Sequence, residues 1–398
     1  MRARQYWALI GCILANVVDG FDVLAVAFTG SALMKAWQLS PATLGMIFSA
    51  GLIGMALGSL FISPLADRHG RRMVSLACMA VMAIGMLASG LATSAPQLIA
   101  LRLLTGLGIG GVLATLNTVV AETAPPARRN LILAIFSAGY PIGSIIGGAL
   151  SVQLIASHGW QIIYFIGGGL TALVLLINVF ALPESGRPSG RVALNFGFLR
   201  RLCEAAGRGP TIAICAAFFL NMLSFFFILN WTPKLMEMIG LSQEEGNRTV
   251  TIINIGSLLG PLIFGYLADR LGLIRMARLY FSGFALAIAA FAFIPGQATA
   301  VLVLSMLIGL CMAGAMTSLY ASAPVLFPAE VRAGGTGIAI GLGRLGGALG
   351  PFLAGQALAI GLSRPILYLV FALPPLIVVA LLWGPWFERV QSRGSQEI

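Results

Sequence analysis

Long apolar runs separated by short polar connections make up most of the chain. Twelve such runs can be marked, at 6–29, 42–66, 73–94, 97–121, 131–153, 160–182, 211–232, 249–269, 276–295, 299–322, 334–359 and 364–386. As a helix, each run is long enough to cross a hydrocarbon core of about 30 Å. The first run is too long for the apolar region of a signal peptide, and it carries two Asp residues. We therefore predict an all-α membrane protein with twelve transmembrane helices.

One connection is long and polar, and it divides the chain into two sets of six runs. We predict an N-terminal six-helix bundle over 1–183, a linker over 184–210 and a C-terminal six-helix bundle over 211–398. The sequence LADRHGRR at 65–72, after the second run, recurs as LADRLG at 267–272, after the eighth. The same signature at the same place in each half indicates two pseudo-symmetric bundles with a binding site near the middle of the membrane.

The basic residues indicate how the helices are oriented. Of the 24 Lys and Arg residues, eighteen lie on the side of the N-terminus, four lie on the opposite side, and Arg102 and Arg344 lie inside runs. This bias predicts that both termini and the linker are cytoplasmic, in the cytoplasmic (inner) membrane. It also accounts for the net charge of +11 without nucleic-acid binding. Only 9% of residues are charged and 59% are hydrophobic, as expected for a multi-pass membrane protein.

Several motifs together resemble those of the major facilitator superfamily. The segment SPLADRHGRR at 63–72 is similar to its loop signature after helix 2, and RLLTGLGIG at 102–110 to its helix 4 signature, while PES stands at 183–185. The motif DGFD at 19–22 and the segment from 327 to 344 resemble the aromatic acid:proton symporter family. The resemblance implies two six-helix bundles and proton-coupled import of a benzoate-like acid. Acidic-sugar and sialate carriers share parts of these segments.

The DGFD motif places two carboxylates, Asp19 and Asp22, on one face of the first helix. A charged carboxylate at mid-membrane costs roughly 2.5–3.5 kcal/mol unless it is protonated, faces water or has a cationic partner. Burial and a like-charged neighbour both favour the protonated form. We predict that the pair carries the coupling proton. The alternative is that one Asp caps a kink at Gly20.

Arg344 is predicted near the bilayer centre, where a guanidinium can hold a substrate carboxylate with two parallel hydrogen bonds or pair with an Asp of helix 1. The alternative is that it ties its helix to a neighbour. Polar and aromatic side chains inside other runs suit a planar aromatic anion. The predicted substrate-binding residues are Arg344, Asn117, Tyr140, Asn221 and Tyr320.

Charged residues at the cytoplasmic helix ends are predicted to form a latch that opens and closes during transport. The predicted gating residues are Asp67, Arg68, Arg71, Arg72, Arg102 and Glu122 in the first half, with Asp269, Arg270, Glu330 and Arg332 in the second. The alternative for the arginines is that they only set the topology. Arg102 lies within its helix, where it either snorkels to the interface or bonds backbone carbonyls of a neighbour, and the resemblance implies that it supports activity.

No nucleotide-binding GxxxxGK[ST] sequence, catalytic triad pattern or metal-ligand spacing occurs in the chain. We therefore predict a transporter, not an enzyme, with no cofactor or metal, driven by the proton gradient. Its partners are a small organic acid, protons and the lipid bilayer, and it works as a monomer. The alternatives are a symporter for a sugar acid, dicarboxylate or sialate, a drug:proton antiporter, and a substrate sensor.

Overall fold

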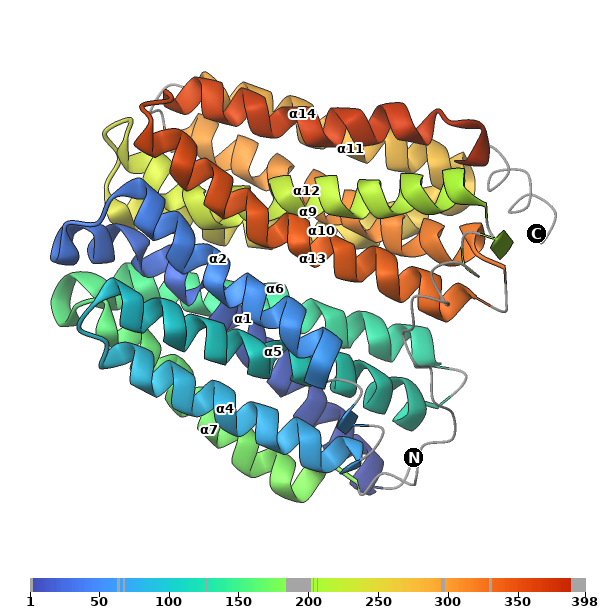
Figure 1. Cartoon of the computed structure of the whole chain (residues 1–398), viewed down its shortest axis with the longest axis horizontal. Helices are drawn as coiled ribbons and strands as arrows, with labels where there is room; N and C mark the ends of the chain where they lie inside the picture. Colours follow the sequence, from blue (N-terminus) through green and yellow to red (C-terminus); the bar gives the residue numbers. More distant parts are fainter. Residues whose placement is uncertain are drawn as a thin grey trace. The chain divides into compact units, whose positions relative to one another are not determined.

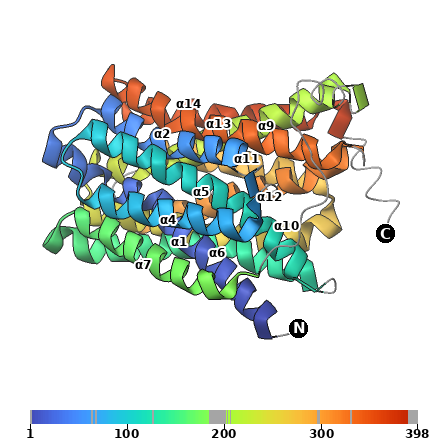
Figure 2. The ribbon, with the colours of Figure 1, turned by 60° about the horizontal axis from the view of Figure 1, so that its bottom comes forward.

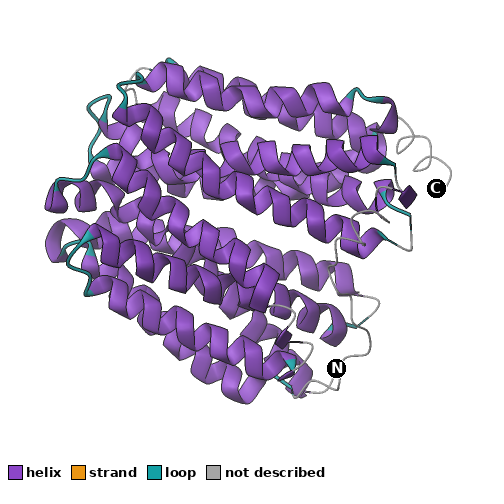
Figure 3. Cartoon of the chain, in the orientation of Figure 1, coloured by secondary structure: helices purple, strands orange, loops and turns teal. Residues whose placement is uncertain are grey.

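The computed structural model is built from long helices joined by short connections, and no strand occurs among the residues it describes (Figure 3). Those residues are 3–62, 65–66, 69–125, 128–183, 202, 204–205, 207–294, 298–328 and 331–387. Twelve helices in these ranges are long and apolar enough to cross a membrane. Each predicted apolar run coincides with one of them.

The first half of the chain contains six of these helices (Figure 1). They are α1 (Ala3–Trp37), α2 (Pro41–Leu57) with its π-helical continuation η1 (Gly58–Ile62), α4 (Arg71–Gly90), α5 (Ala95–Thr123), α6 (Arg129–His158) and α7 (Gln161–Ala181). Within this half α1 is central, because it packs against α2, α5, α6 and α7. Figure 2 shows α4 and α7 lying side by side.

The second half contains the other six helices. They are α9 (Arg208–Glu237), α10 (Gln243–Leu271), α11 (Leu273–Ala292), α12 (Ala298–Leu326), α13 (Arg332–Ala359) and α14 (Arg364–Leu382). Here α11 packs against both α12 and α14, so it corresponds to α4 of the first half. A continuous apolar core joins buried residues of α9, α11, α12 and α14, Phe218 and Phe281 among them.

The chain forms two compact units. The first comprises α1 to α7 together with 230–237 and 241–251, and the second comprises the remaining parts of α9 and α10 with α11 to α14. The predicted boundaries at 183 and 210 flank a segment, 184–201, that lies outside the described residues. Those domain limits stay a prediction.

Closely packed glycines repeat in the two units. In the first, a Cβ on Gly106 of α5 would lie 2.1 Å from the Gly51 carbonyl of α2, and one on Gly110 would lie 2.1 Å from the Met55 carbonyl. In the second, Gly256 and Gly260 of α10 approach carbonyls of α12 equally closely. Small residues let helix backbones touch in this way. The alternating glycines at 106–110 are therefore packing positions.

Several helix ends differ from the predicted limits. The first helix continues to Trp37, so Lys35 lies in its last turn instead of in a loop. Helix α10 begins at Gln243, six residues before the predicted 249. Its start is fixed by a capping box, in which the Glu245 N–H donates to Ser242 Oγ (3.2 Å) and the Ser242 N–H donates to Glu245 Oε2 (2.8 Å).

Candidate functional site

Both carboxylates of the DGFD motif are buried inside the first unit. Asp19 is 3% exposed and Asp22 is fully buried. Helix α1 runs without interruption through Gly20, so there is no broken turn there for an Asp to cap. Neither carboxylate oxygen of Asp22 bonds a backbone amide among the described residues, so Asp22 does not act as a cap there.

Gly20 is explained by the contact between α1 and α6. A Cβ on Gly20 would lie 1.9 Å from the Tyr140 carbonyl, and a Cβ on Gly143 would lie 1.7 Å from the Val17 carbonyl. The Ser144 hydroxyl also donates to the Gly20 carbonyl (3.0 Å). Each of the two helices therefore presents a glycine to the backbone of the other, and this contact holds the DGFD turn against α6.

Tyr140 is brought to the carboxylates by the same contact. Its hydroxyl is buried and has no hydrogen-bond partner among the described residues. It lies close enough to Asp19 for the two groups to interact electrostatically. The structure thus gathers three predicted site residues, Asp19, Asp22 and Tyr140, in one unit.

Arg102 is buried in the same unit, at 3% exposure, and does not snorkel. Its Nη1 donates to the backbone carbonyl of Asp22 (3.5 Å), and its Nη2 donates to Ser89 Oγ (3.0 Å) and Thr105 Oγ1 (3.4 Å). The guanidinium carbon lies 5.0 Å from the centre of the Tyr164 ring. Arg102 therefore connects α1, α4, α5 and α7, and its charge acts on the Asp22 carboxylate.

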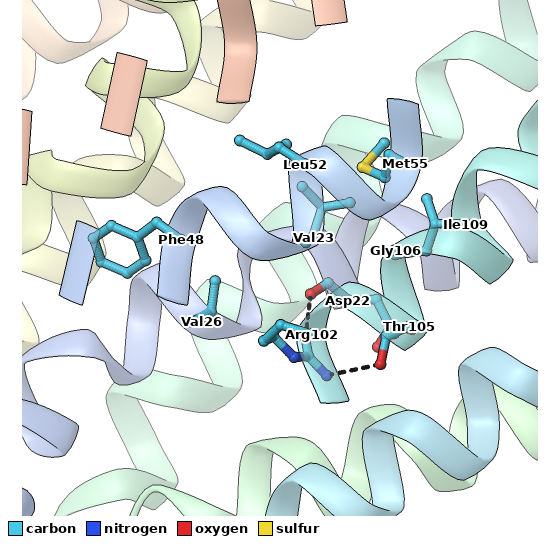
Figure 4. Close-up of a pocket in the computed structure, with 11 residues that line it drawn as sticks. Asp22, Val23, Val26, Phe48, Leu52, Met55, Arg102, Thr105, Gly106 and Ile109 are labelled. Carbon is cyan, nitrogen blue, oxygen red and sulfur yellow. Dashed lines mark hydrogen bonds between the residues drawn. The ribbon is translucent and has the colours of Figure 1, made fainter. Parts of the chain in front are cut away.

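A small cavity lies between Asp22 and Arg102 (Figure 4). The residues that line it come from α1, α2 and α5: Asp22, Val23, Val26, Phe48, Gly51, Leu52, Met55, Arg102, Thr105, Gly106 and Ile109. About 20 Å³ of it can hold the centre of a water-sized sphere. In this structure the cavity therefore has room for about one water molecule.

Tyr164 and Thr29 also belong to this cluster, although their sequence positions did not predict it. The Tyr164 hydroxyl lies 3.0 Å from Thr29 Oγ1, and both side chains are fully buried. A tyrosine in an apolar run needs a partner for its hydroxyl. That signal was present at Tyr164, but nothing in the sequence links it to Arg102.

The second unit holds a separate group of predicted substrate-binding residues. Arg344 on α13 is half-buried and lies close enough to Tyr320 on α12 for their charges to interact. The Tyr320 ring is 45% exposed and packs edge-on against Phe218 of α9, with ring centres 5.5 Å apart. Asn221, one turn after Phe218, is fully buried and donates to Met316 Sδ (3.2 Å). A cation, a phenol and an aromatic wall thus lie together.

Asn117 lies on α5 of the first unit. It is exposed, and its Nδ2 donates to the Leu113 carbonyl of its own helix (3.1 Å). Its predicted contact with substrate stays a prediction.

The predicted latch is partly formed in the first unit. Arg71, at the start of α4, makes an ion pair with Glu122, in the last turn of α5. Arg72 donates from Nη2 to the Val179 carbonyl near the end of α7 (2.7 Å). Asp67 and Arg68 lie outside the described residues.

In the second unit, the Arg270 guanidinium lies 4.6 Å from the centre of the Tyr266 ring, while Asp269 is exposed. Arg332 donates to the Phe327 carbonyl (3.4 Å), and Glu330 lies outside the described residues. The gating role of both sets stays a prediction.

The chain matches the family described as Major Facilitator Superfamily over residues 12–351 and 214–397. A gallate transporter of Pseudomonas putida is 32% identical to it, over 94% of this chain and 90% of the relative. A 3-(3-hydroxy-phenyl)propionate transporter of Escherichia coli (strain K12) is 30% identical, over 88% of this chain and 86% of the relative.

A solved structure of the nucleoside transporter NupG is similar in fold. It has a TM-score of 0.79 and 16% sequence identity, over 95% of this chain and 100% of that chain. At this identity the likeness concerns the fold alone.

Proposed function

The chain belongs to the major facilitator superfamily, and from that membership we propose that it imports an aromatic carboxylic acid together with protons. The relatives named for gallate and 3-(3-hydroxy-phenyl)propionate support an aromatic acid as substrate. The substrate proposed here is of the benzoate or hydroxybenzoate type.

The observation that carries the substrate proposal is the group formed by Arg344, Tyr320 and Phe218. Arg344 and Tyr320 interact electrostatically, and the Tyr320 ring packs against Phe218. The Arg344 guanidinium binds the substrate carboxylate with two parallel hydrogen bonds. The aromatic side chains pack against the substrate ring. Asn221, in the same unit, supplies a further polar contact.

The coupling proton is carried by the carboxylates of α1. Asp22 is fully buried, and its charge interacts with Arg102 and with Asp19. A carboxylate in this position is stable either as a neutral acid or opposite a cation. It therefore takes up a proton on the outer side and releases it at the cytoplasmic pH. One proton with each monoanion makes the step nearly electroneutral, so the proton gradient drives accumulation without a cofactor.

The proposed location is the cytoplasmic membrane, with both termini on the cytoplasmic side and the monomer as the working unit. The distribution of Lys and Arg supports this orientation. The Arg71–Glu122 ion pair then lies at the cytoplasmic face, where it stabilises one state of the transporter.

The test is uptake of radiolabelled benzoate and 4-hydroxybenzoate into proteoliposomes whose interior is more alkaline than the medium. Accumulation that a protonophore abolishes supports the proposal. Unlabelled sugar acids, dicarboxylates and sialic acid are added as competitors. If one of these competes more strongly than unlabelled aromatic acids, the substrate belongs to that class. Efflux of a cationic drug without acid uptake identifies an antiporter, and binding without movement identifies a sensor. Any of these three results overturns the proposal.

A further inference from the structure

Two short segments of α9 and α10 pack with helices from the first half of the chain. Residues 230–237 of α9, and residues 241–251 with the start of α10, group with the first unit, whereas the rest of both helices groups with the second. The division therefore falls inside two continuous helices, each of which changes its neighbours along its length. In the proposed orientation both segments lie at the outer face of the membrane, and we name them the outer segments.

Asn247 holds the outer segment of α10 against two helices of the first unit. Its side chain is 1% exposed, and Nδ2 donates to the Phe28 carbonyl of α1 (3.2 Å) and to Ser151 Oγ of α6 (3.1 Å). The Ser151 hydroxyl donates onward to the Gly148 carbonyl of its own helix (2.7 Å), so its oxygen accepts the bond from Asn247. One amide group thus joins α1, α6 and α10.

Side chains around this amide pack closely. A Cβ on Gly148 of α6 would lie 2.1 Å from Thr251 Oγ1 of α10, so the two helices approach each other at a glycine. Trp231, in the outer segment of α9, is fully buried and packs edge-on against Phe48 of α2, with ring centres 5.4 Å apart. The outer segments are therefore in contact with α1, α2 and α6, and a substrate molecule passes there only if they separate.

The bonds of Asn247 can break without leaving unpaired groups on their partners. Phe28 lies inside α1, so its carbonyl keeps a bond within the helix. The Ser151 hydroxyl keeps its bond to Gly148. Asn247 Oδ1, in contrast, is buried without a hydrogen-bond partner in the described part of the chain, which destabilises the closed arrangement. Exposure to water would satisfy both ends of this amide.

We propose that the outer segments form an outer gate, that Asn247 is its latch, and that the substrate enters from outside only when this latch opens. The inference deepens the proposed function and rests on it. With the gate closed, Asn247 is bonded to Phe28 and Ser151, and with the gate open it is hydrated. The latch holds α1 six residues after Asp22, about 9 Å along the helix axis. The helix that carries the coupling carboxylates is therefore held by the gate.

A disulfide across the gate tests whether it must open. A Cβ on Gly148 would lie 3.3 Å from the Thr251 Cβ, close to the roughly 3.5–4.5 Å of a disulfide. The variant with Gly148→Cys and Thr251→Cys is assayed in cells for uptake of labelled 4-hydroxybenzoate after oxidation and again after reduction. We expect uptake to fall in proportion to the fraction of molecules that are cross-linked and to return on reduction. Each single cysteine variant should be unaffected by oxidation.

Gly283→Cys is the matched control for the cross-link. A Cβ on Gly283 of α11 would lie 3.9 Å from the Cβ of the native Cys311 on α12. Oxidation then links two helices of the second unit that are not part of the gate, and uptake should not change. Full uptake by the cross-linked gate overturns the inference, as does an equal loss in the control. Absence of uptake by the wild type overturns the proposed function instead.

A second measurement tests the latch without transport. The thiol of Ser151→Cys reacts with a membrane-impermeant maleimide outside intact cells only while the gate is open, and labelling of the wild type is subtracted. Adding Asn247→Ala should raise the labelling rate about fivefold, the population change that one hydrogen bond of average strength produces.

Arg248→Ala is the control for the latch, because Arg248 is the next residue along α10 and pairs with Glu244 at the surface (3.4 Å). It should leave the labelling rate unchanged. An unchanged rate with Asn247→Ala, or labelling from the cytoplasmic side alone, overturns the inference even if the paired cysteine variant does not fold.

Discussion

Replacing Tyr164 tests whether its ring holds Arg102 beside Asp22. Tyr164→Phe keeps the ring under the guanidinium and removes only the bond to Thr29, which is worth about 0.5–1.5 kcal/mol. Thr29 still donates to the Ala25 carbonyl (2.8 Å), so no hydroxyl proton is left unpaired. We expect this variant to unfold slightly below wild type and to transport within about threefold of it.

Tyr164→Leu removes the ring as well. The variant loses the interaction with Arg102, about 0.5–2 kcal/mol, and the edge-to-face contact with Trp160, about 0.5–1.5 kcal/mol. Together these contacts are worth about 1–3.5 kcal/mol, before the cost of the cavity left behind. We expect a clearly lower thermal unfolding midpoint in detergent and a selective loss of gradient-driven uptake relative to exchange of labelled for unlabelled acid at equal pH.

Comparing Tyr164→Phe with Tyr164→Leu shows whether the ring or the hydroxyl of Tyr164 positions Arg102. If Tyr164→Leu unfolds and transports like Tyr164→Phe, the ring does not position Arg102 and the energetic argument fails. If both variants lose gradient-driven uptake equally, the hydroxyl is the important group.

Three further predictions follow from the two units. Asp19→Asn and Asp22→Asn are each expected to abolish accumulation driven by a pH gradient while the protein still inserts, as judged by uptake and membrane content; normal accumulation in both would contradict the proton role. Arg344→Lys keeps the charge but not the paired hydrogen bonds, so the Kd for benzoate should rise about tenfold or more, measured by thermal shift against an acid series; an unchanged Kd would indicate a structural arginine. Gly143→Ala forces α1 and α6 apart and should destabilise the protein by about 1–3 kcal/mol relative to Gly169→Ala, a control at an α7 glycine with open space around a Cβ. The measurement is the thermal unfolding midpoint, and equal midpoints for the two variants would show that the helices adjust to the added methyl group without loss of stability.

Hydropathy and repeated motifs were sufficient to predict the fold. The twelve-helix arrangement and the membership of the superfamily are both confirmed, because apolar length and loop signatures are local properties of the sequence. Helix ends were harder to predict. The polar start of α10 was assigned to a loop, although Ser242 and Glu245 form a capping box visible in the sequence. Hydropathy underestimates the length of helices that continue beyond the hydrocarbon core of the membrane.

The sequence named Asp19, Asp22, Tyr140 and Arg102 as candidate residues, and their roles stay predictions; it did not indicate how these side chains pair. The predicted depth of Arg344 in the membrane made it a candidate partner for the Asp pair. Within its own unit, however, the described contacts of Asp22 are with Arg102. The pairing depends on how α1 and α5 rotate about their axes, and packing against neighbouring helices sets that rotation, as where Gly106 of α5 meets the Gly51 carbonyl of α2. Such packing is a tertiary property, so spacing along one helix does not reveal it. The partnership with Arg344 stays a prediction.

A repeated arginine contact bears on the stiffness of each half. Arg72 of α4 donates to the Val179 carbonyl at the end of α7, and Arg278 of α11 donates to the Leu382 carbonyl at the end of α14 (2.8 Å). The second repeat lacks an arginine at the position of Arg72, where Ile274 stands, and Arg278 supplies the contact from one turn further along.

These contacts satisfy carbonyls that a helix end leaves unpaired, and a charged hydrogen bond of this kind is worth about 1.5–3 kcal/mol. Each half therefore has an arginine of its own that holds the end of its last helix. Fraying of that end costs the energy of this contact, so the last helix of each half resists unwinding there.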